Sequence, residues 1–68
     1  QMFEAFVLIC SVSNANLCHT LQDTYGPYKY KKQCITRAYT IAAELPEYMP
    51  DYVALKFKCF KQTKGTNI

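Results

Sequence analysis

The stretch Tyr52–Phe60, with the sequence YVALKFKCF, decides which fold the rest of the chain can adopt. Its apolar side chains alternate with the smaller or charged residues Ala54, Lys56 and Lys58. The apolar set is Val53, Leu55, Phe57 and Cys59. A period of two is what a strand shows when one face packs on a core and the other meets water or a partner. The stretch is therefore predicted to be a strand with its odd-numbered side chains in the core.

The length of the chain limits it to one small domain. It has 68 residues, of which 50% are apolar and 19% are charged. That composition is too apolar for a disordered chain. A chain this short buries only about 60% of its unfolded surface, so we expect a marginal core that is helped by disulfides, a metal or a second subunit. The ordered core is predicted over about residues 3–60, with residues 61–68 as a flexible tail.

Three elements are predicted before that last strand. Phe3–Val12 is apolar on both parities, which is typical of a central strand, although a helix is the competing interpretation. Leu17–Thr24 alternates more weakly and suits an edge strand, which the turn at Gly26-Pro27 closes. Lys31–Leu45 is predicted to be a helix. Pro46 either ends it or starts a last loose turn, and Pro50 forbids continuation. The apolar stripe of this helix is Cys34, Ala38, Ile41, Ala42 and Leu45.

The order of these elements predicts an α+β fold, namely a small ββαβ domain. The simplest three-stranded sheet has the order 2-1-3, with the first strand antiparallel to both neighbours. The single helix then packs on one face of the sheet, which explains why the first strand is apolar on both parities. The other face of the sheet is left uncovered.

The four cysteines are Cys10, Cys18, Cys34 and Cys59, and no C-x2-C spacing occurs among them. Their spacing disfavours zinc knuckles and thioredoxin-type redox sites. The topology favours two disulfides at opposite ends of the sheet, Cys10–Cys18 and Cys34–Cys59, among three possible pairings. The alternatives are four reduced and buried cysteines, a zinc site that uses three cysteines with His19, and a catalytic Cys–His pair. No paired acid and base accompany such a pair, so we predict no enzyme, no metal site and no cofactor.

Lysines and aromatic residues gather at two places in the sequence. The uncovered face of the sheet is predicted to carry Tyr52, Lys56, Lys58 and Phe60. Beside them would lie either Phe3, Ala5, Val7 and Ile9 of the first strand or the residues of its opposite parity. A second group precedes and opens the helix and consists of Tyr28, Lys29, Tyr30, Lys31 and Lys32. An open apolar and aromatic face on a small domain marks a partner surface or a dimer interface.

These surfaces predict a binding or inhibitory module that acts on another protein. The module could also be a homodimer that pairs through the open face or a sheet edge. The alternative function is binding of single-stranded nucleic acid, because bases stack on aromatic rings while lysines follow the phosphates. The net charge of only +3 and the absence of an RNP-like motif count against that alternative.

The first apolar run bears on localisation. At ten residues, Phe3–Val12 is too short to span a bilayer, which takes about 20 residues, so no membrane association is predicted. Met2 is interpreted as the native start, which predicts no signal peptide. In the alternative, a signal peptide has been removed upstream and the protein is secreted or periplasmic.

Several short motifs together resemble a known group of proteins. They are FEAFVLIC at residues 3–10, Cys18, Gly26-Pro27-Tyr28, Cys34 with Arg37-Ala38, Tyr48-Met49-Pro50, and KFKC at residues 56–59. The pattern resembles small uncharacterised four-cysteine proteins of marine bacteriophages and marine bacteria, and the likeness runs from Phe3 to Cys59. Such proteins often carry Thr or Ser before the helix, where this chain has Tyr30. The resemblance implies a phage accessory protein in the cytoplasm of an infected bacterium, acting on a host protein. That cytoplasm is reducing, which argues against disulfides.

Overall fold

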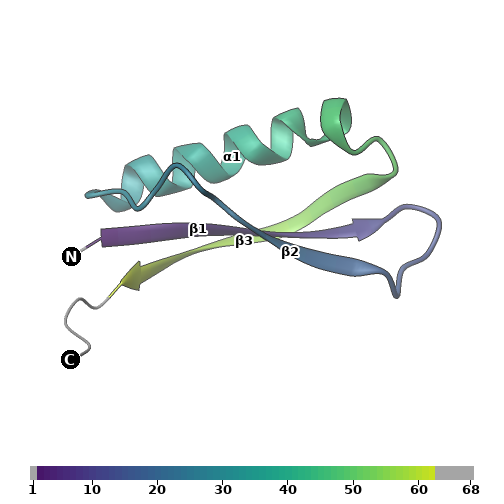
Figure 1. Ribbon diagram of the computed structural model, residues 1–68, viewed down its shortest axis with the longest axis horizontal. Coiled ribbons are helices and arrows are strands. Elements are labelled where there is room, and N and C mark those ends of the chain that lie inside the picture. Colours follow the sequence, from purple (N-terminus) through teal and green to yellow (C-terminus); the bar gives the residue numbers. More distant parts are fainter. Residues whose placement is uncertain (1, 63–68) are drawn as a thin grey trace.

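The fold was analysed in a computed structural model that describes residues 2–62. The elements are the strands β1 (Met2–Ser11) and β2 (Cys18–Gln22), the helix α1 (Lys31–Tyr48) and the strand β3 (Tyr52–Gln62), as Figure 1 shows. Their kinds and order confirm the predicted α+β fold. Residues 61 and 62, which were predicted to belong to a tail, are part of β3, and the rest of that predicted tail lies outside the described residues.

The sheet has the predicted order, β2-β1-β3, and β1 runs antiparallel to both neighbours. Val7 in the middle of β1 lies opposite Leu21 of β2 on one side and Phe57 of β3 on the other. The helix lies along one face of this sheet, and none of the described elements lies over the opposite face (Figure 1). The molecule therefore has one closed and one open side.

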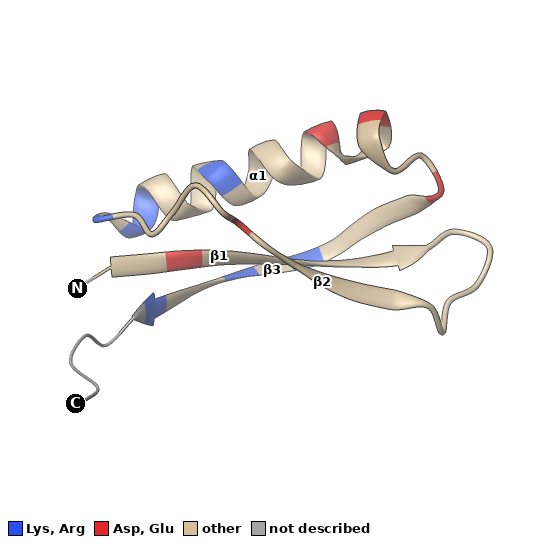
Figure 2. Ribbon diagram, in the orientation of Figure 1, with Lys and Arg blue, Asp and Glu red and all other residues tan. Residues whose placement is uncertain are grey.

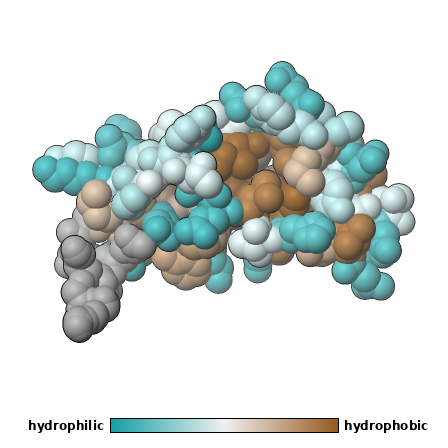
Figure 3. All heavy atoms as spheres, viewed as in Figure 1, coloured by the Kyte–Doolittle hydropathy of each residue, from teal (hydrophilic) through white to brown (hydrophobic). Residues whose placement is uncertain are grey.

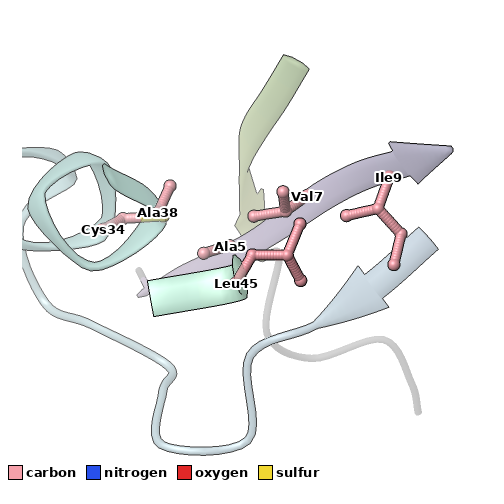
Figure 4. Packing of buried hydrophobic residues seen from close by; sticks show 6 residues of the cluster. All are labelled: Ala5, Val7, Ile9, Cys34, Ala38 and Leu45. Atoms are coloured by element: carbon pink, nitrogen blue, oxygen red, sulfur yellow. The ribbon is translucent and has the colours of Figure 1, made fainter. Parts of the chain in front are cut away.

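The core lies between α1 and the odd-numbered face of β1. Its six members gather there in Figure 4: Ala5, Val7, Ile9, Cys34, Ala38 and Leu45. Successive side chains of a strand point to opposite faces, so the even-numbered Phe6 and Leu8 face the open side. Most of the core residues are small, as expected for a chain of this length. Burying a side chain as large as Ile9 contributes roughly 1.5–3 kcal/mol, so each of them matters.

A β-bulge changes which residues of β3 reach this core. Leu8 pairs with Lys56 but Ile9 pairs with Ala54, so Leu55 is an extra residue without a partner in β1. The prediction that Val53 and Leu55 belong to the core is therefore wrong. The two side chains are 43% and 59% exposed. One inserted residue moves every following side chain to the other face, and simple alternation does not reveal the insertion.

The helix extends three residues beyond its predicted end, and Pro46 lies inside its last turn. Pro46 cannot donate a backbone hydrogen bond, but the Met49 N–H closes the helix on the Leu45 carbonyl at 2.7 Å. At its start, the Gln33 side chain accepts a hydrogen bond from the Tyr30 N–H at 3.2 Å. Figure 2 shows basic residues at the start of α1 and acidic residues near its end, which is the unfavourable arrangement for the helix dipole. Tertiary contacts therefore have to hold α1 in place.

Both predicted disulfides are present. Cys10–Cys18 joins directly opposite residues of β1 and β2, and Cys34–Cys59 joins α1 to β3. No cysteine is free, so neither reduced cysteines nor a zinc site that uses them applies to this structure. The second bridge ties the helix to the sheet, which offsets the poorly placed charges at the helix ends.

Candidate protein-binding face

The uncovered side of the sheet forms a surface that we call the open face. It consists of Phe6, Leu8, Thr20, Lys56, Lys58 and Phe60. These residues, together with Phe57, line a shallow hollow of about 220 Å³. Three strands contribute to it, because the even-numbered positions of β1 and β2 and the lysines of β3 share one side of the sheet.

The lysines of β3 flank the apolar residues of β1. Lys58 lies directly opposite Phe6, and Lys56 lies directly opposite Leu8. Both ammonium-bearing side chains are exposed, while Phe6 and Leu8 are half-buried. Long lysine side chains can cover apolar surface with their stems and keep their charge in water. The open face therefore combines an apolar floor with a positively charged border.

Aromatic contacts fix the ring at the end of this face. The rings of Phe6 and Phe60 meet edge to face with their centroids 5.4 Å apart. The Lys58 Nζ atom lies 5.7 Å from the centre of the Phe60 ring. Even so, Phe60 remains 51% exposed. An exposed ring that is held on two sides loses little further freedom when a partner covers it.

Charge on the open face is mainly positive. Glu4 lies opposite Phe60 at the border of the face, and its Oε1 atom accepts a hydrogen bond from Gln22 Nε2 at 3.2 Å. Lys56 and Lys58 border the same face along the edge strand β3. A complementary surface would therefore be apolar at its centre and would carry acidic side chains around it.

The structure brings together three of the four residues predicted for this face, Lys56, Lys58 and Phe60. The prediction that Tyr52 lies on the open face is wrong, because the bulge turns its side chain to the helix side. There it packs against the core, and its ring lies 5.8 Å from the ring of His19. Phe6 and Leu8 belong to the second of the two parities that the sequence left open for β1, and Thr20 was not identified from the sequence. β1 is apolar on both parities, so its pattern alone does not tell which side faces the helix.

The second predicted group lies apart from the open face, around the start of α1. Lys29, Tyr30, Lys31 and Lys32 are exposed. Tyr28 differs from the prediction, because it pairs with Phe3 through two backbone hydrogen bonds of 2.7 and 2.8 Å and packs against the core. Tyr28 is thus half-buried, and its hydroxyl is engaged inside the molecule by Asp23.

Asp23 organises the connection between β2 and α1, and sequence analysis did not single it out. Its buried carboxylate accepts hydrogen bonds from the Tyr28 hydroxyl, from the Tyr25 N–H at 3.1 Å and from Arg37 Nε at 3.2 Å. Burial alone would raise the pKa of Asp23, but these three hydrogen bonds hold it below its usual value. Burial and the nearby carboxylate raise the pKa of Tyr28 to about 12.

The rest of the connection packs around the same carboxylate. The Arg37 guanidinium lies 4.6 Å from the centre of the Tyr25 ring. A Cβ atom at Gly26 would come within 3.0 Å of the Tyr28 ring, so only glycine fits there without movement. These polar groups satisfy one another, which is typical of a structural network that holds a loop against a helix.

Within residues 2–62, no group of three or more His, Cys, Asp and Glu side chains is placed to hold a metal ion. In the same part of the chain, no helix has the length and apolar character needed to cross a membrane.

No protein-family model, curated protein or solved structure matches this chain.

Proposed function

We propose that the chain is a protein-binding module and that its open face docks a partner whose surface is apolar at the centre and acidic around it. The observation that carries the proposal is the hollow that Phe6, Leu8 and Phe60 form between exposed lysines. Apolar side chains with a charged rim are the usual composition of a protein interface.

The positive border favours a separate partner over a second copy of the chain. Two copies joined through their open faces with β3 stacked on β3 would bring Lys56 and Lys58 of one toward the same lysines of the other. Like charges that meet at an interface are costly. An acidic partner would gain attraction from the same side chains, so homodimerisation through this face is the less favourable form.

Nucleic acid is the second candidate, because Lys58 lies beside the exposed Phe60 ring. A stacking platform needs ring faces that successive bases can cover. Phe6 meets Phe60 by its edge and is half-buried, while Tyr28 and Tyr52 are packed elsewhere. Phe60 is the one exposed ring of the open face, which supports a protein partner more than a nucleic acid.

The biological setting that we propose follows from the resemblance to small phage and marine bacterial proteins. In that setting the partner is a protein of the bacterial host, and the chain is an accessory or inhibitory factor. The two disulfides are compatible with an oxidising compartment. They support an exported or periplasmic protein over one that works in the reducing cytoplasm.

The proposal can be tested by placing a photo-crosslinking amino acid at single positions. With the crosslinker at Phe60, we expect a specific protein adduct in cells, and we expect it to be lost when Lys56→Glu and Lys58→Glu are added. With the crosslinker at Ala43, an exposed position on the helix, the same adduct should not form. An adduct that persists in the double variant, or that contains only nucleic acid or a second copy, would rule out the proposed partner.

A further inference from the structure

A second apolar surface lies on the other side of the sheet, next to β2. Among the described elements, α1 lies closely along β1 and β3, whereas β2 contributes one apolar residue, Leu21, that packs against the core. This leaves a groove of about 180 Å³ between the helix and β2, which we call the edge groove. Figure 3 shows apolar atoms gathered between α1 and the strands below it. The apolar lining of the groove is Leu21, Ile41, Leu45 and Met49.

The hydrogen bonds at both ends of β2 show which of its backbone groups are directed outward. The Asp23 N–H donates to the Ala5 carbonyl at 2.9 Å, and the Ser11 N–H donates to the Leu17 carbonyl at 2.9 Å. In an antiparallel ladder, alternate residues direct their backbone groups to opposite sides. Residues 19 and 21 therefore bond to β1. The backbone groups of Cys18, Thr20 and Gln22 point away from it, along the free edge.

The two edges of the sheet differ in how they are protected against further pairing. Proteins commonly block an exposed edge with charged residues, proline or a bulge. The edge strand β3 carries several lysines and the bulge at Leu55. The edge strand β2, with the sequence CHTLQ, contains neither proline nor any lysine, arginine, aspartate or glutamate. Of the two edges, β2 is therefore the one suited to pairing with an added strand.

We propose that β2 and the edge groove bind an extended peptide segment of another protein as a fourth strand of the sheet. A peptide residue bonded to Thr20 would face the open side, and its two neighbours would face the edge groove. Those neighbours should be apolar. Two charged residues line the groove, Arg37 and the exposed Glu44. Arg37 is paired with Asp23 at 3.2 Å, so Glu44, with Glu47 close to it in α1, is the charge that a basic residue of the segment would meet. This site meets the open face at Thr20, whose side chain belongs to that face, while the outward backbone groups of β2 and the edge groove lie outside it.

The probe for this proposal is a short synthetic peptide of alternating valine and threonine with a lysine at each end. When it is added to the intact, oxidised protein, we expect shifts in the NMR signals of the Thr20 and Gln22 amides and slower hydrogen exchange at both. The matched control is the same peptide with N-methyl groups on the amides that would face β2, which removes the donors but keeps the side chains. Equal binding of the methylated peptide would overturn the proposal.

Two variants at one position test the role of the backbone. Thr20→Pro removes an N–H that points away from β1, so it should leave the sheet intact and weaken peptide binding by roughly tenfold. Thr20→Ala keeps the N–H and should bind the peptide as the unchanged chain does. An equal loss of peptide affinity in both variants would mean that the Thr20 side chain, and not its backbone N–H, binds the peptide. If Thr20→Pro does not fold, Ile41→Ala, which enlarges the groove, replaces it and should also weaken binding.

Two further results would count against the proposed occupant. A dimer that forms as the protein concentration rises, with slow exchange at Thr20 and Gln22, would place a second copy at this edge. Peptide-induced shifts that are confined to Lys56 and Lys58 would place the peptide on the open face. The variant with Lys56→Glu and Lys58→Glu should bind the peptide normally, so a failure of this proposal and a failure of the proposed function can be told apart.

Discussion

Asp23 shows how one buried carboxylate can fix a loop that the sequence pattern leaves undefined. It lies just after β2, and its partners are the Tyr25 N–H, the Tyr28 hydroxyl and Arg37 of the helix. A buried charge is tolerated only when it is paired and hydrogen-bonded, and here all three donors are supplied by the protein. The side chain therefore joins β2, the following connection and α1.

Replacing Asp23 tests this role. We expect Asp23→Asn to lower the free energy of unfolding by roughly 1–3 kcal/mol at neutral pH, because hydrogen bonds to a charged group are lost. The folded-state pKa of Asp23 lies below its unfolded value, so its contribution is complete above that unfolded value and is lost as the pH falls through the folded-state pKa. Urea unfolding at neutral and at acidic pH should show the difference between the two proteins shrinking in acid.

The control for Asp23→Asn is Glu47→Gln, which removes one charge from an exposed position of α1. We expect it to change the free energy of unfolding by less than about 0.5 kcal/mol. If the two variants unfold alike, Asp23 is not the centre of the network.

Tyr28 allows a second prediction about the same hydrogen-bond network. The chain has six tyrosines, and the pKa of Tyr28 is raised to about 12 by burial and by Asp23. The folded-state pKa of Tyr28 lies above its unfolded pKa of 10.0. Its contribution to stability is therefore complete below pH 10.0 and is lost as the pH rises toward the folded-state pKa of about 12. An ultraviolet titration should show a late phenolate transition that disappears in Tyr28→Phe. A titration curve that is the same in both proteins would contradict the assignment.

Among the elements, β3 departs most from its expected form, because of the bulge at Leu55. The structure predicts that Leu55→Ala costs less than about 1 kcal/mol, since the side chain is largely exposed. By contrast, Ile9→Ala in β1 should cost about 2–5 kcal/mol, because Ile9 is fully buried. Chemical denaturation of both variants makes the comparison. A large loss in Leu55→Ala would mean that β3 has no bulge and that Leu55 lies in the core.

The two disulfides should contribute unequally to stability. Cys34–Cys59 closes a separation of 25 residues and Cys10–Cys18 one of 8. The chain-entropy account then predicts that the longer bridge contributes about 1 kcal/mol more. We therefore expect Cys34→Ala with Cys59→Ala to lower the melting temperature more than Cys10→Ala with Cys18→Ala. The opposite order would mean that α1 is held to the sheet chiefly by other contacts.

How far the sequence predicts this fold depends on which interactions are periodic. The apolar run of β1, the stripe of α1 and the alternation at Phe57 and Cys59 predict the sheet order and the disulfide pairing. The bulge at Leu55 is a single inserted residue with no marker in the pattern. The sequence leaves open whether Pro46 ends the helix or starts a last turn, and the hydrogen bond from the Met49 N–H to the Leu45 carbonyl shows that the turn forms.

On the open face, the bulge likewise separates the residues whose side could be predicted from those whose side could not. Lys56, Lys58 and Phe60 lie downstream of the bulge, where strand alternation holds, so their shared side could be predicted. Tyr52 lies upstream of it, so its predicted side was reversed. Tyr28 was misjudged for another reason: its burial depends on Asp23, which is far from the open face and belongs to a contact between side chains that no periodicity reveals.

For the whole molecule, the main feature is that one helix covers only part of a three-stranded sheet. The helix is held over β1 and β3 by the core and by Cys34–Cys59. Consequently one face of the sheet stays open and one groove remains beside β2. Charge is also unevenly distributed, with basic residues along β3 and at the start of α1 and acidic residues around the end of α1 (Figure 2). A small chain thus offers two surfaces of different charge.

Affinity capture from nuclease-treated extracts of the cells that carry the gene tests whether the open face is the binding surface. Three proteins are compared: the unchanged chain, the chain with Lys56→Glu and Lys58→Glu, and a control with Lys31→Glu and Lys32→Glu. The control makes the same change of charge at the start of α1. The account predicts one protein that the unchanged chain and the control retain and the open-face variant loses. Retention by all three, or loss from the control alone, would contradict the assignment of the open face as the binding surface.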